Sequence, residues 1–197
     1  MTTRPSVVGP EAGPNAPYPY KMEGKVISGF GRGSKEKHSH KPRSSASPTA
    51  NLPVDDADTP WIAAIPSGVY FGYASLALPE SHPDRPSTSA AFHIFPMVMS
   101  IGYNPFYNNT VRSAEVHVLH KFTADFYDAP MRLLILEFIR EEKNYDSLEA
   151  LIDDINFDCV VAKKSLAREH WAPAKGLVVG SPDVDGKLDA EWLVRSV

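Results

Sequence analysis

AFHIFPMVMSIGY, residues 91–103, is an almost unbroken apolar run rich in β-branched and aromatic residues. Three runs of the same kind flank it, namely GVYFGYASLAL at 68–78, SAEVHVLHKF at 113–122 and MRLLILEFIRE at 131–141. Val, Ile, Tyr and Phe favour strands, and the Pro, Gly and Asn residues between the runs are typical of turns. MEGKVISGF, at 22–30, predicts a further short strand. The sequence therefore predicts a mainly β fold.

The period of the apolar residues changes after residue 146. From there they recur every three or four positions, at Leu148, Leu151, Ile152, Ile155, Cys159, Ala162 and Leu166. Asp146 and Glu149 have the spacing of an N-cap and an N3 residue, so the pattern predicts one amphipathic helix from Ser147 to about Glu169. Several short strands followed by one long helix favour a closed or nearly closed β-barrel with a C-terminal helical cover.

Composition limits the domain count and the classes of partner. The chain has 197 residues, 43% of them hydrophobic, which suits one compact domain. Its net charge of −4 gives no global attraction to nucleic acid or to an acidic membrane surface, and no strong local basic patch replaces it. A single cysteine, Cys159, excludes an intramolecular disulfide framework. We expect no nucleic-acid or membrane partner.

Both ends of the chain differ in composition from its centre. Residues 1–20 contain five prolines and no apolar stretch, which predicts a disordered arm and argues against a signal peptide or membrane anchor. Residues 21–171 hold the predicted strands and helix and form the expected domain. Residues 172–197 contain turn signals and one short apolar patch, and form a C-terminal tail.

The glycine cluster GFGRGSK offers the first candidate site. Gly29, Gly31 and Gly33 would let the backbone approach a phosphate, and Ser34 and Lys35 could supply a hydroxyl and a positive charge. The spacing matches neither a P-loop nor GxGxxG, and a flexible turn is the commoner explanation of such a cluster.

The segment PTAN, residues 48–51, offers a second candidate. Thr49 and Asn51 lie two positions apart, so in an extended backbone both side chains project to the same side. Magnesium prefers oxygen ligands and is often completed by water and by nucleotide phosphates, so these two residues could share a Mg²⁺ ion. An Asn/Pro turn before a strand is the alternative.

Glu115 is the third candidate. Strand alternation places Glu115 and His117 on one face and Val116 and Val118 on the other. A carboxylate near a barrel mouth could orient or deprotonate a substrate hydroxyl in phosphoryl transfer, although an exposed strand glutamate is more common. His117 and His120 are more often packed or solvated than ligands.

These segments together resemble a known family. GFGRGSK, PTANL, GVYFGYASL, MSIGYNPFYNNTVRSAEVHVLHKFTADFY and FIREEKNYDSLEALIDDI occur in the order found in eukaryotic monofunctional riboflavin kinases, over about residues 18–171. The resemblance implies a closed six-stranded antiparallel Greek-key barrel. It also implies transfer of a phosphoryl group from MgATP to the 5′-hydroxyl of riboflavin, which makes FMN.

The resemblance also assigns roles to particular residues. It implies that ATP lies near the glycine segment, that Thr49 and Asn51 coordinate the metal, and that Glu115 is the catalytic carboxylate. Arg140 is similar to the family's flavin-side arginine. The expected metal is magnesium, with zinc or another divalent ion as the alternative. We expect a monomeric protein of the cytoplasm, with the mitochondrion left open as a second compartment.

Two departures from the family pattern affect the predicted site. The segment EKHSHKPRSSAS, residues 36–47, makes the link before PTAN longer than is usual. Asp128 stands where a glycine is common in the turn after DFY. The longer loop leaves an alternative function open, namely a non-catalytic barrel that binds a flavin or a nucleotide.

Overall fold

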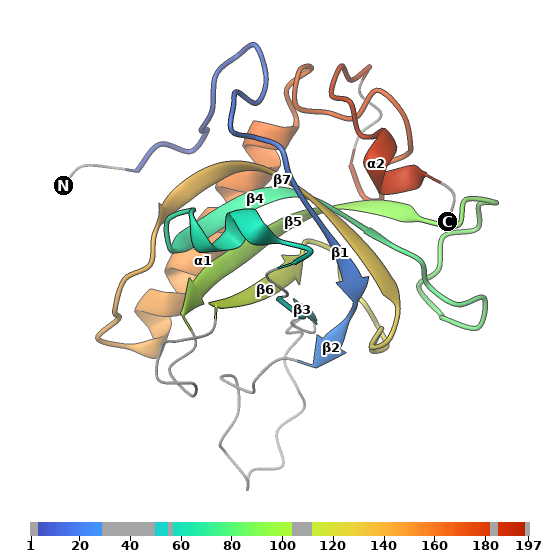
Figure 1. Cartoon of the computed structure of the whole chain (residues 1–197), viewed down its shortest axis with the longest axis horizontal. Coiled ribbons are helices and arrows are strands. Elements are labelled where there is room, and N and C mark those ends of the chain that lie inside the picture. The colour runs from blue at the N-terminus through green and yellow to red at the C-terminus, as the bar shows by residue number, and fades with distance from the viewer. Residues whose placement is uncertain (1–3, 29–49, 55–56, 104–111, 182–184, 196–197) are drawn as a thin grey trace, which may run out of the picture.

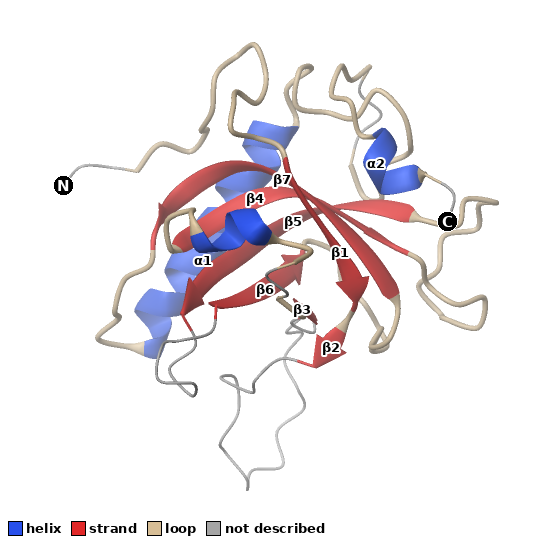
Figure 2. Cartoon of the chain, viewed as in Figure 1, coloured by secondary structure: helices blue, strands red, loops and turns tan. Residues whose placement is uncertain are grey.

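The computed structural model describes residues 4–28, 50–54, 57–103, 112–181 and 185–195 (Figure 1). The strands are β1 (Tyr20–Lys25), β2 (Ile27–Ser28), β3 (Ala50–Leu52), β4 (Gly68–Leu76), β5 (His93–Tyr103), β6 (Arg112–Val118) and β7 (Pro130–Glu141). The helices are α1 (Leu148–Leu166), α2 (Glu191–Val194) and a short 3₁₀ turn, η1 (Pro60–Ala63). The mainly β prediction with one long helix is confirmed (Figure 2).

All strand pairs are antiparallel, and they form one curled sheet. Its order is β1-β7-β4-β5-β6-β3-β2. β1 and β2 are separated only by Val26, so the sheet is built from six chain segments, the first of which is bent. The Val26 N–H donates to the Ala129 carbonyl at 3.0 Å, and the Asp128 N–H donates to the Val26 carbonyl at 2.9 Å. These bonds hold the chain beside β7 up to Val26, after which it joins β3.

The prediction of a closed barrel is wrong. Within the described residues the two edges of the sheet, β1 and β2, are not hydrogen-bonded to each other, and the sheet is a half-barrel. Side chains occupy the space between β1 and β3, because a Cβ placed on Gly24 would lie 3.5 Å from both Leu52 Cδ2 and Pro53 Cδ. Side-chain packing therefore replaces a hydrogen-bonded ladder at this edge.

Strand alternation produces a hydrophobic core on each face of the sheet. The inner face buries residues such as Tyr70, Met97 and Val116, and the outer face buries Phe71 and Val98 beneath α1 and the C-terminal segment. The alternation seen in the sequence thus corresponds to two hydrophobic cores, one on the concave inner face of the sheet and one between its outer face and α1.

Helix α1 covers the outer face only with its C-terminal half. The buried residues of α1 are Asp158, Val161, Ala162, Ser165 and Leu166. Three apolar residues of its first half stay exposed, with 65% of Leu148, 46% of Ile152 and 41% of Ile155 accessible. Ser147, and not Asp146, is the N-cap, since its side chain accepts a hydrogen bond from the Ala150 N–H at 3.1 Å. No helix of the described residues has the length and apolarity that crossing a membrane requires.

The segment expected to be a disordered arm makes many contacts along α1. The Val8 N–H donates to Ser165 Oγ at 3.0 Å, and Trp171 Nε1 donates to the Pro10 carbonyl at 2.9 Å. Gly9 has a φ of +80° and lies so close to the Trp171 ring that a Cβ there would be 2.3 Å from Cη2. These contacts fix the register between the arm and the helix.

The C-terminal segment also packs onto the sheet. Ile94 and Val178 form a parallel bridge, and Trp192 Nε1 donates to the Leu133 carbonyl at 3.2 Å. Leu188 and Leu193 are buried in the outer core. The tail therefore extends the cover that α1 provides.

Asp128 is the only non-glycine residue of the described chain with a positive φ, +64°. The left-handed conformation is costly for a residue with a Cβ, so we expect Asp128→Gly to raise the free energy of unfolding by up to about 1 kcal/mol. Urea denaturation measures the change. Asp125→Gly, three residues earlier, is the matched control and should lower stability or leave it unchanged. A loss of stability in Asp128→Gly would show that the Asp128 side chain itself supports the turn.

Candidate functional site

One row of residues crosses the outer face of the sheet and contains three of the predicted site residues. It begins with the pairs Asn51–Glu115, between β3 and β6, and Glu115–Ser100, between β6 and β5. It continues with Ser100–Val69, between β5 and β4, and Val69–Arg140, between β4 and β7. Residues directly opposite each other in antiparallel strands project to the same face. The fold therefore aligns Asn51, Glu115 and Arg140.

Asn51 is an unusual buried residue. Only 1% of it is exposed, and neither its Oδ1 nor its Nδ2 has a hydrogen-bond partner among the described residues. A buried amide without partners costs free energy, so its presence needs an explanation. Its flanking residues Ala50 and Leu52 belong to the inner core, and this directs Asn51 to the opposite, outer face. Asn51 is thus placed to give an oxygen ligand to a group bound there.

Glu115 lies directly opposite Asn51. Its strand neighbours Ala114 and Val116 are buried in the inner core, and Glu115 itself is half-buried on the outer face. The Cβ atoms of such a pair are about 5 Å apart, so the carboxylate and the amide belong to neighbouring side chains on one face of the sheet. This is the oxygen-rich arrangement that a hydroxyl group and a magnesium-bound phosphate would require.

Several predicted site residues lie outside the described part of the chain. These are Gly29, Gly31, Gly33, Ser34, Lys35 and Thr49. The described residues on either side of this segment, Ser28 and Ala50, are paired between β2 and β3. In the same ladder Ile27 is the partner of Asn51, so the predicted phosphate segment leaves and re-enters the fold beside the Asn51–Glu115 pair.

Arg140 lies at the other end of the row, where β7 is irregular. The register between β4 and β7 shifts twice, between Phe71 and Gly72 and between Val69 and Tyr70. Such bulges re-aim side chains, and here they place Arg140 on the outer face next to α1. Glu115 is three strands away, which corresponds to about 14 Å along the sheet.

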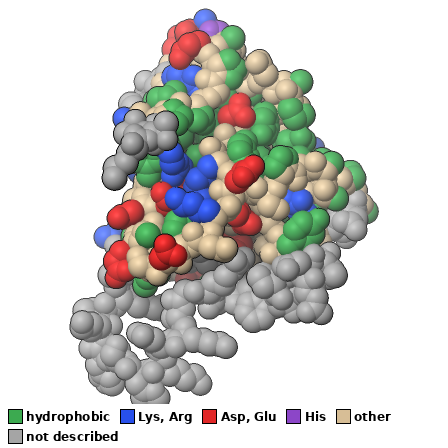
Figure 3. All heavy atoms as spheres, turned by 90° about the vertical axis from the view of Figure 1, so that its left-hand side faces the viewer, with side chains coloured by type: hydrophobic (Ala, Val, Ile, Leu, Met, Phe, Trp, Pro, Cys, Tyr) green, Lys and Arg blue, Asp and Glu red, His purple; other side chains and the backbone are tan. Residues whose placement is uncertain are grey.

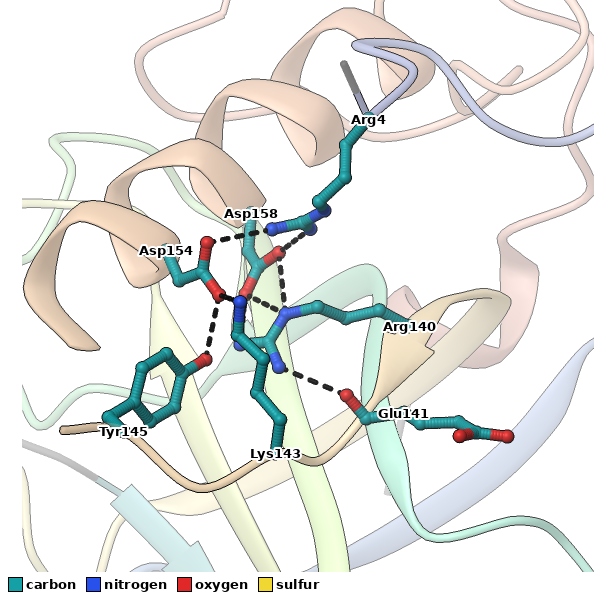
Figure 4. A network of polar contacts seen from close by, with 7 residues as sticks. All are labelled: Arg4, Arg140, Glu141, Lys143, Tyr145, Asp154 and Asp158. Atoms are coloured by element: carbon teal, nitrogen blue, oxygen red, sulfur yellow. Dashed lines mark hydrogen bonds and ion pairs between the residues drawn. The ribbon is translucent and has the colours of Figure 1, made fainter. Parts of the chain in front are cut away.

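Arg140 forms a dense ionic contact with Asp158 of α1 (Figure 4). Its Nη2 lies 2.8 Å and its Nε 3.0 Å from Asp158 Oδ2, and Nη1 donates to the Glu141 carbonyl at 3.0 Å. Burial alone would lower the pKa of Arg140, but the hydrogen bonds and charge of Asp158 outweigh burial and raise the pKa. The guanidinium is therefore permanently charged and fixed in orientation.

A second carboxylate of α1 extends this network. Asp154 accepts from Lys143 Nζ at 2.5 Å, from Tyr145 Oη at 2.9 Å and from Arg4 Nη1 at 3.2 Å. Burial would raise the pKa of Asp154, while the hydrogen bonds of Lys143 and Tyr145 hold it below its usual range. This end of the row thus brings together the N-terminal arm, the end of β7 with the link that follows it, and α1.

A cavity of about 370 Å³ lies beside this network. Its lining residues are Arg4, Pro5, Val8, Ile139, Arg140, Glu141, Glu142 and Lys143. On the face of the molecule shown in Figure 3, basic and acidic side chains adjoin each other among apolar ones. The cavity therefore combines apolar walls with both cationic and acidic side chains, a mixed lining that suits a ligand with apolar and polar parts.

The histidines of β6 and of the turn that follows it do not form a metal site. His120 packs against the rings of Phe95 and Phe122, with centroid distances of 5.1 and 4.7 Å. Burial, with a smaller contribution from Lys163, lowers the pKa of His117. The described residues contain no group of three or more His, Cys, Asp or Glu side chains that could hold a metal ion. An oxygen site that uses Asn51 and a nucleotide is not of that type.

Sequence reasoning missed two residues at this site. Asp158 interrupts the apolar spacing between Ile155 and Ala162, and a carboxylate at a core-facing helix position was a usable signal. Arg4 gave no signal, because a lone arginine in a proline-rich arm resembles a solvated residue. Its partners lie 150 and 154 residues away.

The sequence matches one protein family. The family model described as riboflavin kinase, or flavokinase, matches residues 16–166. Curated riboflavin kinases are similar over nearly the whole chain. The one from Pyricularia oryzae is 66% identical, covering 98% of this chain and 96% of the relative. The one from Chaetomium globosum is 55% identical, covering 98% and 93%.

A solved structure supports the same family. The crystal structure of riboflavin kinase from Trypanosoma brucei is 25% identical in sequence and superposes with a TM-score of 0.56. It covers 77% of this chain, and the match covers 82% of that chain. The shared fold thus extends across most of both molecules.

Proposed function

The chain belongs to the riboflavin kinase family, and we infer that it transfers the γ-phosphoryl group of ATP to the 5′-hydroxyl of riboflavin, which gives FMN and ADP. The structural observation that supports this inference is that Asn51 of β3 and Glu115 of β6 lie opposite each other on the outer face of the sheet. That pair brings a candidate phosphate-side ligand next to a candidate base. The function expected from the sequence is therefore supported by the family and by the fold.

We propose that Glu115 is the catalytic carboxylate. A carboxylate oxygen of Glu115 accepts the proton of the riboflavin 5′-hydroxyl, while the hydroxyl oxygen of riboflavin forms a bond to the γ-phosphorus. The bond between the γ-phosphorus and the bridging oxygen breaks, and ADP leaves with the electron pair. The half-buried position of Glu115 on a paired strand holds the carboxylate still during this step.

The family implies a divalent metal with the nucleotide, and the described residues fit magnesium. Asn51 offers an unpartnered buried oxygen, and Glu115 opposite it adds negative charge. These are hard oxygen groups of the kind that Mg²⁺ prefers, and the ion keeps waters and phosphate oxygens as further ligands. Asn51, with Thr49, would hold the metal, which when bound neutralises phosphate charge.

We propose that Arg140 contacts the flavin ring system. Its guanidinium lines the cavity beside α1, about 14 Å along the sheet from Glu115. This separation suits a substrate whose reacting hydroxyl stands at the end of a ribityl chain and whose ring system lies at the other end. Phosphate chemistry and flavin recognition would then occupy opposite ends of one row.

The decisive experiment is FMN formation by the purified protein from riboflavin and MgATP, followed by chromatography. We expect FMN production that stops when the divalent metal is removed with a chelator and returns when Mg²⁺ is added. Tight riboflavin binding without FMN formation would instead establish the alternative, a flavin-binding module. Failure to bind riboflavin would contradict both functions.

A further inference from the structure

Two arginines that are far apart in the sequence share one buried carboxylate. The side chain of Asp158 is 2% exposed, and it pairs with Arg140 of β7 and with Arg4 of the N-terminal arm (Figure 4). A buried carboxylate is costly unless it is paired, so both contacts matter to its placement. Arg4 binds Oδ1, while the shorter contacts of Arg140 are made to Oδ2.

Arg4 therefore restricts how Arg140 can bind Asp158. An unshared carboxylate and a guanidinium can form several bidentate pairs, in which either the Nε edge or the Nη edge of arginine is used. Arg4 contacts Oδ1, and Arg140 directs Nη2 and Nε to Oδ2 at 2.8 and 3.0 Å, with a longer contact from Nε to Oδ1 at 3.2 Å. Nη1 is directed to the Glu141 carbonyl. The Arg140 guanidinium is therefore fixed by Asp158 on one side and by the Glu141 carbonyl on the other.

This arrangement leaves part of Arg140 available to a ligand. A guanidinium carries five N–H groups, and the contacts among described residues use three of them. Arg140 and Arg4 both line the cavity of about 370 Å³. The remaining N–H groups belong to a side chain whose position Asp158 and Arg4 determine.

The arm that carries Arg4 is itself firmly placed. Arg168 donates to the carbonyls of Val8 and Gly9 at 2.6 and 2.9 Å. Lys164 Nζ lies 3.4 Å from Ser6 Oγ. The arm follows α1, so residue 4 reaches the helix turn that contains Asp154 and Asp158.

We propose that Arg4 is a positioning residue of the flavin side of the site, and that it acts through Asp158 on Arg140. The N-terminal arm is then a working part of the riboflavin-binding site, although it lies outside the sheet and contains no proposed ligand. The proposal rests on the proposed function, because it takes Arg140 as a flavin contact.

A double-mutant cycle with riboflavin as the probe tests this proposal. Riboflavin Kd is measured by fluorescence quenching for the wild type, Arg4→Ala, Arg140→Ala and the double variant. We expect Arg4→Ala to raise the riboflavin Kd about fivefold and to leave the KM for ATP within about twofold. In the Arg140→Ala background the same change should have no further effect. Arg4→Lys, which keeps the charge but loses the planar fork, should recover only part of the affinity.

The outcomes separate this proposal from the proposed function. An unchanged riboflavin Kd in Arg140→Ala would remove Arg140 from the flavin site and contradict that part of the proposed function. A clear effect of Arg140→Ala with none from Arg4→Ala would overturn the role of Arg4 alone. Equal effects of Arg4→Ala in both backgrounds would mean that Arg4 does not act through Arg140.

Two controls exclude a purely structural explanation. Glu11→Ala removes another ion pair of the arm, the 3.4 Å contact with Arg168, and should leave the riboflavin Kd unchanged. Thermal unfolding of every variant shows whether the arm has only a stabilising role. A lowered Tm accompanied by parallel losses of riboflavin and ATP affinity in Arg4→Ala would contradict positioning.

Discussion

Replacement of Glu115 by glutamine is expected to lower kcat for FMN formation by about a thousandfold, within the usual range for loss of a general base. Glutamine keeps the shape and hydrogen-bonding capacity of the side chain but cannot accept the hydroxyl proton. Riboflavin Kd should stay within about twofold, because the flavin-side contacts of Arg140 lie three strands away. Single-turnover kinetics at saturating MgATP measure the chemical step directly.

Glu23→Gln is the matched control for that change. Glu23 lies on β1 and pairs with Arg132 and Arg195, away from the row that contains Glu115. Its kcat should remain close to that of the wild type. A Glu115→Gln variant that keeps full turnover would remove Glu115 from the mechanism, and one that also loses riboflavin binding would show a folding defect instead.

Replacement of Asn51 by leucine is expected to move stability and activity in opposite directions. Leucine has a similar volume and removes two buried amide atoms that have no partner among the described residues, so the free energy of unfolding should rise by about 1–2 kcal/mol. The loss of an oxygen ligand should lower kcat/KM for MgATP by about a hundredfold. Urea denaturation without ligands and initial rates over a range of Mg²⁺ concentrations measure the two effects.

Ser75→Ala and Asn51→Asp are the controls for this prediction. Ser75 Oγ is also buried without a partner among the described residues, but it lies towards the other end of β4. Ser75→Ala should therefore raise stability without changing kcat/KM. Asn51→Asp restores an oxygen ligand and should recover Mg²⁺-dependent activity at some cost in stability. Lower stability in Asn51→Leu would mean that the amide is satisfied in the protein and has a structural role.

A gain in stability together with a loss of activity in Asn51→Leu would show that the buried amide of Asn51 is kept for function. Native proteins retain polar groups in costly positions when the site needs them, and stability is lost in return. Asn51 is in such a costly position, because its amide is buried without a partner among the described residues and its neighbours Ala50 and Leu52 are buried in the inner core. The cost would be offset when metal and nucleotide bind.

The sequence alone determined the main strands and the long helix, and it predicted several site residues. Strand alternation and the three-to-four-residue helix period are local properties, and they located β4, β5, β6, β7 and α1. The same alternation put Glu115 on the face opposite Val116, and the structure has that arrangement. Family resemblance supplied the roles of Asn51, Glu115 and Arg140, which remain proposals for experiment.

Only the tertiary structure decided how these elements meet. The helix period identified an apolar face but could not show that its first half, including Leu148 and Ile152, stays exposed, because a local pattern does not contain the surface that covers it. The open edge of the sheet depends on side chains of β3 that meet β1. The Asn51–Glu115 pair depends on the register of strands far apart in the chain.

The Arg4–Asp158–Arg140 cluster is the clearest case. Arg4 by itself resembles an ordinary charged residue of a proline-rich arm, and charged residues are usually solvated. Arg4 meets Asp158 across 154 positions and Arg140 meets it across 18. The spacing could mark Asp158 as a carboxylate on the core-facing side of the helix, but it could not name its partners, because these contacts arise only when the helix packs on the sheet and the arm packs on the helix.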